Sequence, residues 1–520
     1  MKMKFTLPLF TLLLLSALAS AQPQNIKLSS SAASSVNEVS VAFNPQNTNE
    51  LVVGANLRWV YASTDGGLTW SENKLASTLG ERGDPVVVCD SSGNFFYVHI
   101  GSNGLVCQKA VGATGAWNVG AQIVPNLNKA QDKPWVSTDM HNDIIYTTWT
   151  QYDDCFGCTA GPTDSTRVFI SHSRDKGATW SSPKRMNKAA GDCNYKDVVD
   201  PTPCLGQNGQ IYVAWEDSSG ILFNTSSDTG NTWMSSPVFV STVPGAFYYK
   251  VPGIPFGRVR PDPVTACDLS NSVYRGNVYI VWSDQRNGVN NTDVFLVKSS
   301  DGGHTWNTPA KVNSDVTNTH QFFGNLTVDQ SNGNIYVLFY DRRNFTDTLE
   351  VQTEVYMAQS KDGGATFTNY KMSQTPFICD STVFIGDYIG IAAQNNQIRP
   401  IWTRNDNSAT SIWTAIADAS TLGIEELKKN GNLELEVSYP NPFREQTTIA
   451  FNLIAPTSVS MKVYDMYGKE VAQLLDRSNM ETGNHKVVFD NRNYQLAPGI
   501  YFYSLSDGHS ALSGKMALMK

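Results

Sequence analysis

The 520-residue sequence has little charge and no long basic run. Lysine and arginine number 39 against 47 aspartates and glutamates, which gives a formal net charge of −8, and charged residues make up only 17% of the chain. An acidic balance without a basic patch argues against nucleic acid as a partner. Beyond the N-terminus, no apolar stretch reaches the roughly 18 residues that a membrane-spanning helix needs. We therefore expect no nucleic-acid partner and no transmembrane segment in the mature chain.

The N-terminus holds the longest apolar stretch. Lysines at positions 2 and 4 precede an apolar run from Phe5 to Leu18, and the small residues Ala19-Ser20-Ala21 follow it. This order is typical of a secretory signal peptide with its cleavage site, here residues 1–21. We therefore expect the protein to be exported.

Cysteine is sparse, and all eight residues lie before residue 380, at positions 89, 107, 155, 158, 193, 204, 267 and 379. An exported protein can form disulfides. Cys155 with Cys158, and Cys193 with Cys204, lie in loop-like sequence, and we predict local disulfides there. A zinc site is the alternative, although the gap between Cys158 and Cys193 is long for a zinc-ligand pattern.

One short motif recurs five times. Residues 63–70 read S-x-D-x-G-x-T-W, and further copies occupy 173–180, 226–233, 299–306 and 360–367, the last with Phe in place of Trp. An Asp followed two residues later by Gly, between β-forming residues, predicts a tight turn that closes a β-hairpin. A unit repeated at intervals of roughly fifty to seventy residues indicates a propeller or a solenoid.

The aspartates of this motif are interpreted as structural, because each carboxylate can accept backbone N–H groups within its turn. They are Asp65, Asp175, Asp228, Asp301 and Asp362. The pattern resembles the Asp box, or BNR repeat, of sialidase-type β-propellers. This resemblance implies an all-β propeller over residues 22–419.

Seven modules can be read in that range, each with a short apolar second strand rich in β-branched and aromatic residues. These strands are Leu51–Ala55, Phe95–Ile100, Ile144–Trp149, Ile211–Trp215, Val278–Trp282, Ile335–Phe339 and Ile398–Trp402. Seven modules predict seven blades. Six is the alternative, because sialidases with this box usually have six. The last module lacks an outer strand, and the segment Asn25–Leu28 is the candidate to supply it and close the ring.

The sequence changes character after residue 419. Residues 420–432 are predicted to be a polar linker, and alternating strands over residues 433–520 predict a small antiparallel β-sandwich. Tyr439-Pro-Asn-Pro-Phe443, Val463-Tyr-Asp465 with its following Gly-Lys turn, and the basic C-terminus resemble the type IX secretion sorting domain, or Por secretion tail. This resemblance implies type IX secretion machinery as a partner and a secreted or cell-surface location. A carbohydrate-binding sandwich is the alternative.

Aspartates recur where the innermost strand of a module begins, at positions 84, 132, 200, 262 and 387. Because hairpin turns alternate between the two ends of a blade, these residues lie on the face opposite the Asp boxes. Together they are expected to ring the mouth of the central channel. Salt bridges between blades are the structural alternative for such charges. We expect no cofactor, although a ring of aspartates can also bind calcium.

Sialidases hold a substrate carboxylate with an arginine cluster, protonate the leaving oxygen with an aspartic acid and use a tyrosine as nucleophile. The resemblance implies Asp84 or Asp132 as the acid and Tyr388 as the nucleophile. The substrate-binding residues implied in the same way are Arg286, Arg343, Arg404, Asp262 and Asp200.

The sequence thus favours a secreted or cell-surface sialidase-like glycoside hydrolase that acts on acidic glycans. Two alternatives stay open because propellers host unrelated functions. One is a non-catalytic propeller that binds glycan or protein, and the other is a polysaccharide lyase on the same scaffold.

Overall fold

The computed structural model describes residues 23–30, 33, 35–126, 129–153, 166–188, 191, 198–245, 248–255, 258–345, 351–420, 422, 428–436, 438–441, 443–466 and 468–519. The chain divides into two compact units, Gln22–Asp418 and a unit that contains Ala419–Lys520. The described residues form strands and turns without an α-helix, so the all-β class is confirmed. None of them forms a helix able to cross a membrane. The predicted signal peptide and Cys155, Cys158 and Cys193 lie outside these residues.

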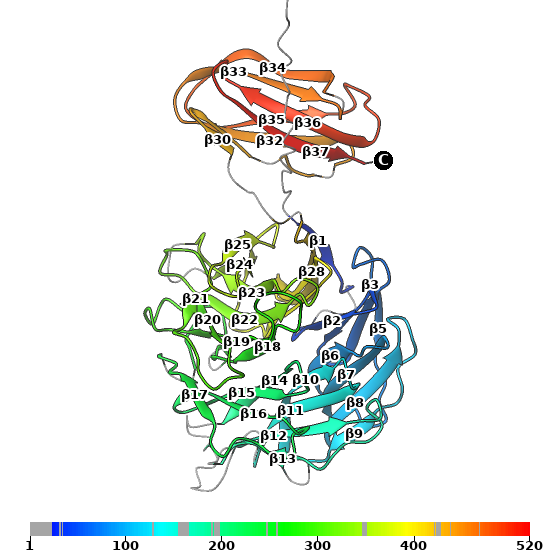
Figure 1. The fold of residues 1–520 in the computed structure, drawn as a ribbon. Coiled ribbons are helices and arrows are strands. Elements are labelled where there is room, and N and C mark those ends of the chain that lie inside the picture. Colours follow the sequence, from blue (N-terminus) through cyan, green and yellow to red (C-terminus); the bar gives the residue numbers. More distant parts are fainter. Residues whose placement is uncertain are drawn as a thin grey trace, which may run out of the picture. The chain divides into compact units, whose positions relative to one another are not determined.

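The larger unit contains seven consecutive antiparallel sheets within its described residues (Figure 1). In chain order, the first three consist of β2 (Ser40–Asn44), β3 (Asn47–Ala55), β4 (Trp59–Ser63) and β5 (Ser71–Lys74); β6 (Gly83–Cys89), β7 (Asn94–Gly101), β8 (Gly104–Val111) and β9 (Ala121–Val124); and β10 (Ala130–Asp139), β11 (Ile144–Tyr152), β12 (Thr166–Ser173) and β13 (Lys184–Arg185).

The next three sheets repeat this order. They consist of β14 (Val199–Leu205), β15 (Ile211–Asp217), β16 (Gly220–Ser226) and β17 (Val238–Ser241); β18 (Val264–Cys267), β19 (Val278–Asp284), β20 (Asp293–Ser299) and β21 (Ala310–Lys311); and β22 (Gln321–Val328), β23 (Ile335–Asp341), β24 (Gln352–Ser360) and β25 (Thr368–Lys371), with β26 (Phe377–Ile378) paired to β24.

The seventh sheet joins the two ends of this unit. It contains β27 (Gly390–Gln394), β28 (Gln397–Asp406) and β29 (Ala409–Asp418), and its outer strand is β1 (Gln24–Lys27) from the N-terminus. β1 pairs antiparallel with β29, Gln24 opposite Ile416 and Lys27 opposite Trp413. Asn25 also donates from Nδ2 to the Met372 carbonyl at 2.8 Å, which ties β1 to the sixth sheet. The predicted closure by the N-terminal segment is confirmed by this pairing.

Large aromatic side chains fill the spaces between neighbouring sheets. Trp149, Trp215, Trp282 and Trp402 stand at one register near the ends of second strands, and all are at most 1% exposed. Trp149, for example, shares a core cluster with Val86 of the preceding sheet. Burial of such rings is the main apolar stabilisation that one sheet gives the next. The first strands of all seven sheets line an axial channel with a volume of about 340 Å³.

The Asp boxes are built alike in all five copies, as the sequence predicts. In the first, Asp65 accepts from Ser63 Oγ, the Thr69 backbone N–H and Thr69 Oγ1 at 2.6–2.9 Å. The same three contacts surround Asp175, Asp228, Asp301 and Asp362. The carboxylate of each box thus accepts hydrogen bonds from residues of its own turn.

The C-terminal unit is a sandwich of two four-stranded sheets. One contains β30 (Lys428–Asn430), β31 (Leu433–Leu435), β32 (Gln446–Leu453) and β35 (Gly483–Asp490), and the other contains β34 (Glu470–Met480), β33 (Thr457–Tyr464), β36 (Gly499–Ser506) and β37 (Ala511–Leu518). β30 falls within the predicted linker 420–432. Asn441 mimics a strand partner for β37, because its amide donates to the Lys515 carbonyl and accepts from the Ala517 N–H. This contact explains the Y-P-N-P-F sequence.

Candidate active site at the channel mouth

A β-bulge at one register brings charged side chains to one end of the channel. In the ladders of the second, third and fourth sheets, the register shifts after Gly83, Asp132 and Val199. The bulge residue has a positive φ, a conformation that non-glycine residues rarely adopt and that clusters at functional sites. The residues with this backbone on or next to the first strands are Glu38, Asp84, Lys133, Asp200, Asp262 and Phe323.

Lys133 is the centre of the resulting charge cluster. Its ammonium lies 3.6 Å from Asp200, 3.8 Å from Asp262 and 3.5 Å from Asp387, although these partners belong to other sheets. Only 13% of its side chain is exposed. Asp132 is the residue predicted for this position of the ring. The bulge instead gives the position to Lys133, and Asp132 stays one residue earlier in the ladder, opposite Thr150.

Two arginines also contact the carboxylates that surround Lys133. Arg260 contacts Asp200 and lies 3.4 Å from Asp262, and it is itself 92% buried on its side chain. Arg258 lies 3.2 Å from Asp387, with almost half of its side chain exposed and its guanidinium over the Phe384 ring. Cations beside carboxylates favour the charged form of both. In this half of the mouth, Asp200, Asp262 and Asp387 thus each contact a cation.

The other half of the mouth holds three carboxyl groups that share hydrogen bonds. The Asp84 side chain bonds to both Glu38 and Asp132. Burial, and then the charges of Glu38 and Asp132, raise the pKa of Asp84 well above its usual range. Burial and the charge of Asp387 raise the pKa of Glu38 to about 7. Glu38, Asp84 and Asp132 thus form a carboxyl trio, and the raised pKa values of Glu38 and Asp84 favour a shared proton between these two groups near neutral pH.

Asn56 orients this trio from the first sheet. Its Oδ1 accepts the Asp84 backbone N–H at 2.7 Å, and its Nδ2 donates to Glu38 and to Asn37 Oδ1. The Asn56 side chain is buried, so its amide has no competing water at this position. It thereby fixes both the bulged backbone of Asp84 and the carboxyl group of Glu38.

Tyr388 lies beside the cluster. It is half-buried and lines a small pocket together with Lys133 and Asp262, its Oη donates to the Pro85 carbonyl at 3.4 Å, and its ring packs on Trp135 with the centroids 5.5 Å apart. Burial and the neighbouring charge of Glu38 raise the pKa of Tyr388 well above its usual value. The phenolate that a tyrosine nucleophile needs is therefore disfavoured here.

The arginines implied as a carboxylate clamp each have an aspartate partner within their own hairpin. Arg286 pairs with Asp284 at 2.5 Å and stacks 4.3 Å from Phe295. Arg343 repeats this arrangement with Asp341 at 2.6 Å and the Tyr356 ring at 4.2 Å.

Arg404 pairs with Asp406 at 2.7 Å and lies over the Trp413 ring. Among the described residues no contact joins Arg404, Arg286 or Arg343 to one another or to the cluster around Lys133. Their shared spacing reflects a repeated hairpin structure.

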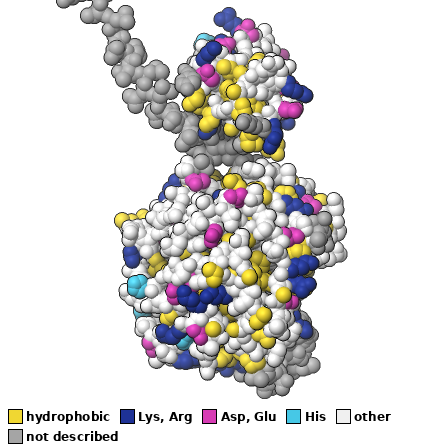
Figure 2. Space-filling model, turned by 90° about the vertical axis from the view of Figure 1, so that its right-hand side faces the viewer, with side chains coloured by type: hydrophobic (Ala, Val, Ile, Leu, Met, Phe, Trp, Pro, Cys, Tyr) yellow, Lys and Arg dark blue, Asp and Glu magenta, His cyan; other side chains and the backbone are white. Residues whose placement is uncertain are grey.

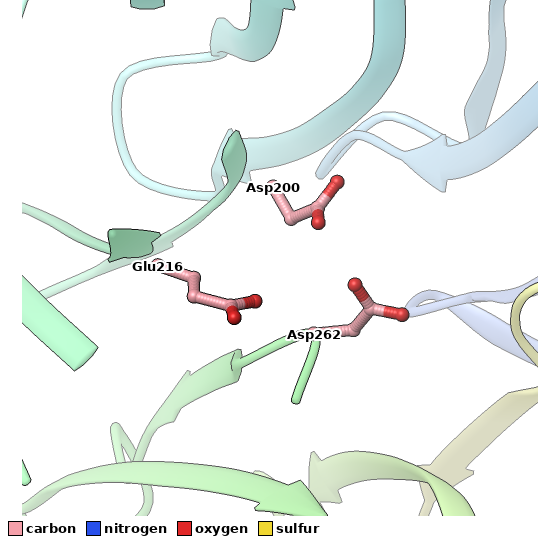
Figure 3. Close-up of side chains that lie close together, drawn as sticks. All are labelled: Asp200, Glu216 and Asp262. Atoms are coloured by element: carbon pink, nitrogen blue, oxygen red, sulfur yellow. The ribbon is translucent and has the colours of Figure 1, made fainter. Parts of the chain in front are cut away.

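The geometry also identifies three acidic ligand atoms that could face one cation. Oxygens of Asp200, Glu216 and Asp262 lie within 4.8 Å of one another, and Figure 3 shows the three side chains converging from separate strands. The ammonium of Lys133 and the guanidinium of Arg260 already lie beside Asp200 and Asp262. These two cations compensate the carboxylates that calcium would need, so the residues do not fit a bound metal well.

Two members of the cluster, Glu38 and Lys133, are not predicted from the sequence. Glu38 precedes the first innermost strand without the Asp-Pro pair that marks later ones, and Lys133 lies inside Asp-Lys-Pro, where the Asp carries the repeated pattern. Arg258 and Arg260 precede a blade entry, and this position predicts them on the face that carries the site. Distance from the start of each first strand is the sequence signal that identifies such residues. The β-bulge brings the residue at that position to the channel mouth whatever its type.

The repeated sheets, the axial channel and the five Asp boxes define an Asp-box β-propeller. The chain belongs to the BNR repeat-like domain family, whose model matches residues 156–449. Residues 437–519 match the secretion system C-terminal sorting domain, which confirms the predicted type IX sorting tail. That domain directs the chain to secretion and attachment at the cell surface.

Individual relatives are distant. The xyloglucanase Xgh74A of Acetivibrio thermocellus is 22% identical over 298 residues, which covers 51% of this chain and 32% of that protein. The chain thus spans about a third of the length of this curated relative. Among solved structures, the Hadza microbial sialidase Hz136 has 14% identity, a TM-score of 0.41 and coverage of 72% of this chain and 74% of its own. The Trypanosoma rangeli sialidase in complex with sialic acid has 12% identity, a TM-score of 0.40 and coverage of 86% and 85%.

Proposed function

We propose that this protein is a secreted, cell-surface glycoside hydrolase whose reaction takes place at the channel mouth. The observation that carries the proposal is the division of the mouth into the carboxyl trio, in which the pKa values of Glu38 and Asp84 are raised, and a set of carboxylates that contact cations. Glycosidases need one carboxylic acid that keeps its proton at neutral pH and one carboxylate that stays charged. The channel mouth supplies both groups, because the carboxyl trio lies on one side of it and the carboxylates that contact cations lie on the other.

Within this scheme, Asp84 is the general acid that protonates the leaving oxygen, because its two carboxyl neighbours and its burial keep it protonated. Glu38, whose pKa is raised to about 7, can resupply that proton to Asp84. Asp262, one of the carboxylates that contact cations, is the group that activates water or attacks the sugar. It is held by Lys133 and Arg260, and its side chain is 24% exposed, against 2% for Asp200 and 6% for Asp387.

The charge balance favours neutral glycans over acidic ones. Glu38 and Asp84 share a proton, and even without them the mouth holds more carboxyl groups than cations: Asp132, Asp200, Glu216, Asp262 and Asp387 stand against Lys133, Arg258 and Arg260. The expectation of an acidic substrate depends on Arg286, Arg343 and Arg404, which have aspartate partners of their own. An uncompensated substrate carboxylate would be repelled by the remaining negative charge.

The test is turnover by the mature full-length chain on a panel of neutral polysaccharides, uronic-acid polysaccharides and a fluorogenic sialoside. We expect release of reducing sugar from a neutral glycan. Asp84→Asn should reduce kcat by about 10²–10⁴-fold, the usual contribution of general acid catalysis. Asp217→Asn, at the end of β15 on the same face but bonded to Ser219, is the matched control and should retain activity.

A second candidate function is glycan binding without turnover. The ion pairs of Lys133 with Asp200, Asp262 and Asp387 favour it, because a carboxylate held by a cation is a weaker base than a free one. Saturable binding of a glycan by the wild-type chain, with no product after long incubation and equal affinity of Asp84→Asn, would replace hydrolysis with this function.

A further inference from the structure

Two cysteines of neighbouring sheets occupy the same apolar space. Cys204 lies on β14 and Cys267 on β18, the innermost strands of the fourth and fifth sheets, and both are buried. They belong to one core cluster, together with Tyr212 and Phe223, and both line the axial channel. The prediction that Cys204 lies in a loop is wrong, because Cys204 is the next-to-last residue of the buried strand β14. In the structure, Cys204 and Cys267 are both free thiols.

Hydrogen bonds hold these two strands side by side next to the thiols. Thr202 Oγ1 donates to the Pro263 carbonyl at 2.7 Å, and Thr265 Oγ1 donates to the Thr202 carbonyl at 3.0 Å. Each cysteine lies two residues beyond a threonine of this pair, on the same face of its strand, since side chains alternate along a strand. The backbone therefore directs both sulfur atoms into the space between the sheets.

We propose that Cys204 and Cys267 form a disulfide between the fourth and fifth sheets in the exported protein. The oxidant is a disulfide of the thiol-oxidoreductase or glutathione class. The thiolate of one cysteine attacks the donor disulfide, forms a mixed disulfide and releases one donor thiolate. The other cysteine then attacks the protein sulfur and releases the second donor thiolate, so two electrons pass to the donor.

The cross-link has to form before the propeller closes. Burial raises the pKa of Cys267 to about 12, and burial together with the charge of Cys267 raises that of Cys204 further. The thiolate, which is the reactive form, is then scarce in the folded protein. Formation is therefore expected while the chain folds in the oxidising compartment, and the finished bond is expected to resist reductants until the protein unfolds.

The disulfide would also stabilise the channel mouth. Asp200 lies on β14 and Asp262 lies two residues before β18, each a few residues before its cysteine, so a bond between Cys204 and Cys267 would limit the spacing of these carboxylates. It closes a chain loop of considerable length, and such loops gain the most from cross-linking. This role is independent of whether the mouth hydrolyses or only binds a glycan.

The test is peptide mapping of the mature full-length chain, purified from an exporting host, alkylated in denaturant without reductant and digested. We expect a linked peptide pair that contains Cys204 and Cys267, with little alkylation of either. The same treatment after dithiothreitol under native conditions should leave the link intact. Complete alkylation of both residues without reduction would overturn the proposal.

Melting temperatures distinguish a disulfide between Cys204 and Cys267 from ordinary packing of two thiols. Cys204→Ser, Cys267→Ser and the double variant should each lose about the same few degrees, because either substitution already removes the bond. Cys89→Ser, at another buried position along the channel, is the matched control for a lost thiol. Losses of the two single variants that add up in the double variant would contradict the proposal, as would equal losses in protein refolded under full reduction.

Discussion

Lys133 and Asp387 meet across the channel mouth: the Lys133 ammonium lies 3.5 Å from Asp387 Oδ2, although one residue belongs to the third sheet and the other precedes the seventh. The same ammonium reaches Asp200 and Asp262. One side chain thus joins four blades at the end of the channel where the candidate site lies.

Replacing Lys133 should therefore cost more stability than its partial exposure suggests. In Lys133→Met, Asp200 and Asp387 lose a cation while they stay buried, and breaking a buried pair in this way costs roughly 3–5 kcal/mol. Denaturant unfolding of the full-length mature chain measures the effect. Lys361→Met, at an exposed position, is the control and should stay within about 0.5 kcal/mol of wild type.

The trio at the mouth should make stability fall as pH rises. The folded pKa of Glu38 is about 7, above its ordinary value, so the folded state holds this proton more tightly than the unfolded chain. The stability that this proton adds to the folded state is present at low pH and is lost between about pH 4.5 and 7. Glu38→Gln should be on the order of 3 kcal/mol more stable than wild type at pH 8 and close to it at pH 4.5. Equal pH profiles for the two proteins would contradict the assignment.

The Asp boxes should show the opposite pH dependence. The backbone N–H and the hydroxyl of Thr232 donate to Asp228 and lower its pKa to about 2. A depressed folded pKa adds stability above the unfolded value, and this stability is lost as the pH falls through about 2. Asp228→Asn should lower the melting temperature by a degree or two at pH 6 and by less at pH 2, with turnover unchanged. Asp217→Asn serves as the control.

Removing the closing strand should open the ring. Deleting residues 22–30 leaves the outer edge of β29 unpaired and removes the contact of Asn25 with Met372. The melting temperature should fall by several degrees, and the exposed edge should promote association between molecules. Scanning calorimetry with light scattering measures both effects, and an unchanged melting profile would show that β1 contributes no closure.

Calcium should have no effect on the propeller. Lys133 and Arg260 already compensate two of the three carboxylates that face one another at the mouth. Melting curves of the full-length chain in EDTA and in millimolar calcium should coincide. A rise in melting temperature with calcium that Glu216→Gln abolishes would show that an ion displaces one of these cations.

Local pattern was enough to predict much of the fold. The S-x-D-x-G-x-T-W turns depend on contacts within a few residues, such as Asp65 with Thr69, so residue spacing alone predicts these hairpins. The closing strand and the Y-P-N-P-F segment make long-range contacts, with β29 and β37. They were predictable for other reasons: a strand was missing from the last module, and the Y-P-N-P-F segment resembles a known sorting domain.

The membership of the candidate site was decided by tertiary structure. A bulge of one residue put Lys133 rather than Asp132 at the centre, and closing the ring brought Glu38 from the first sheet against Asp84 of the second. Arg286 and Arg343 share a spacing because they serve the same hairpin, not because they converge. Sequence determines which charges each blade carries, but only radial packing determines which charges meet, because the partners are far apart along the chain.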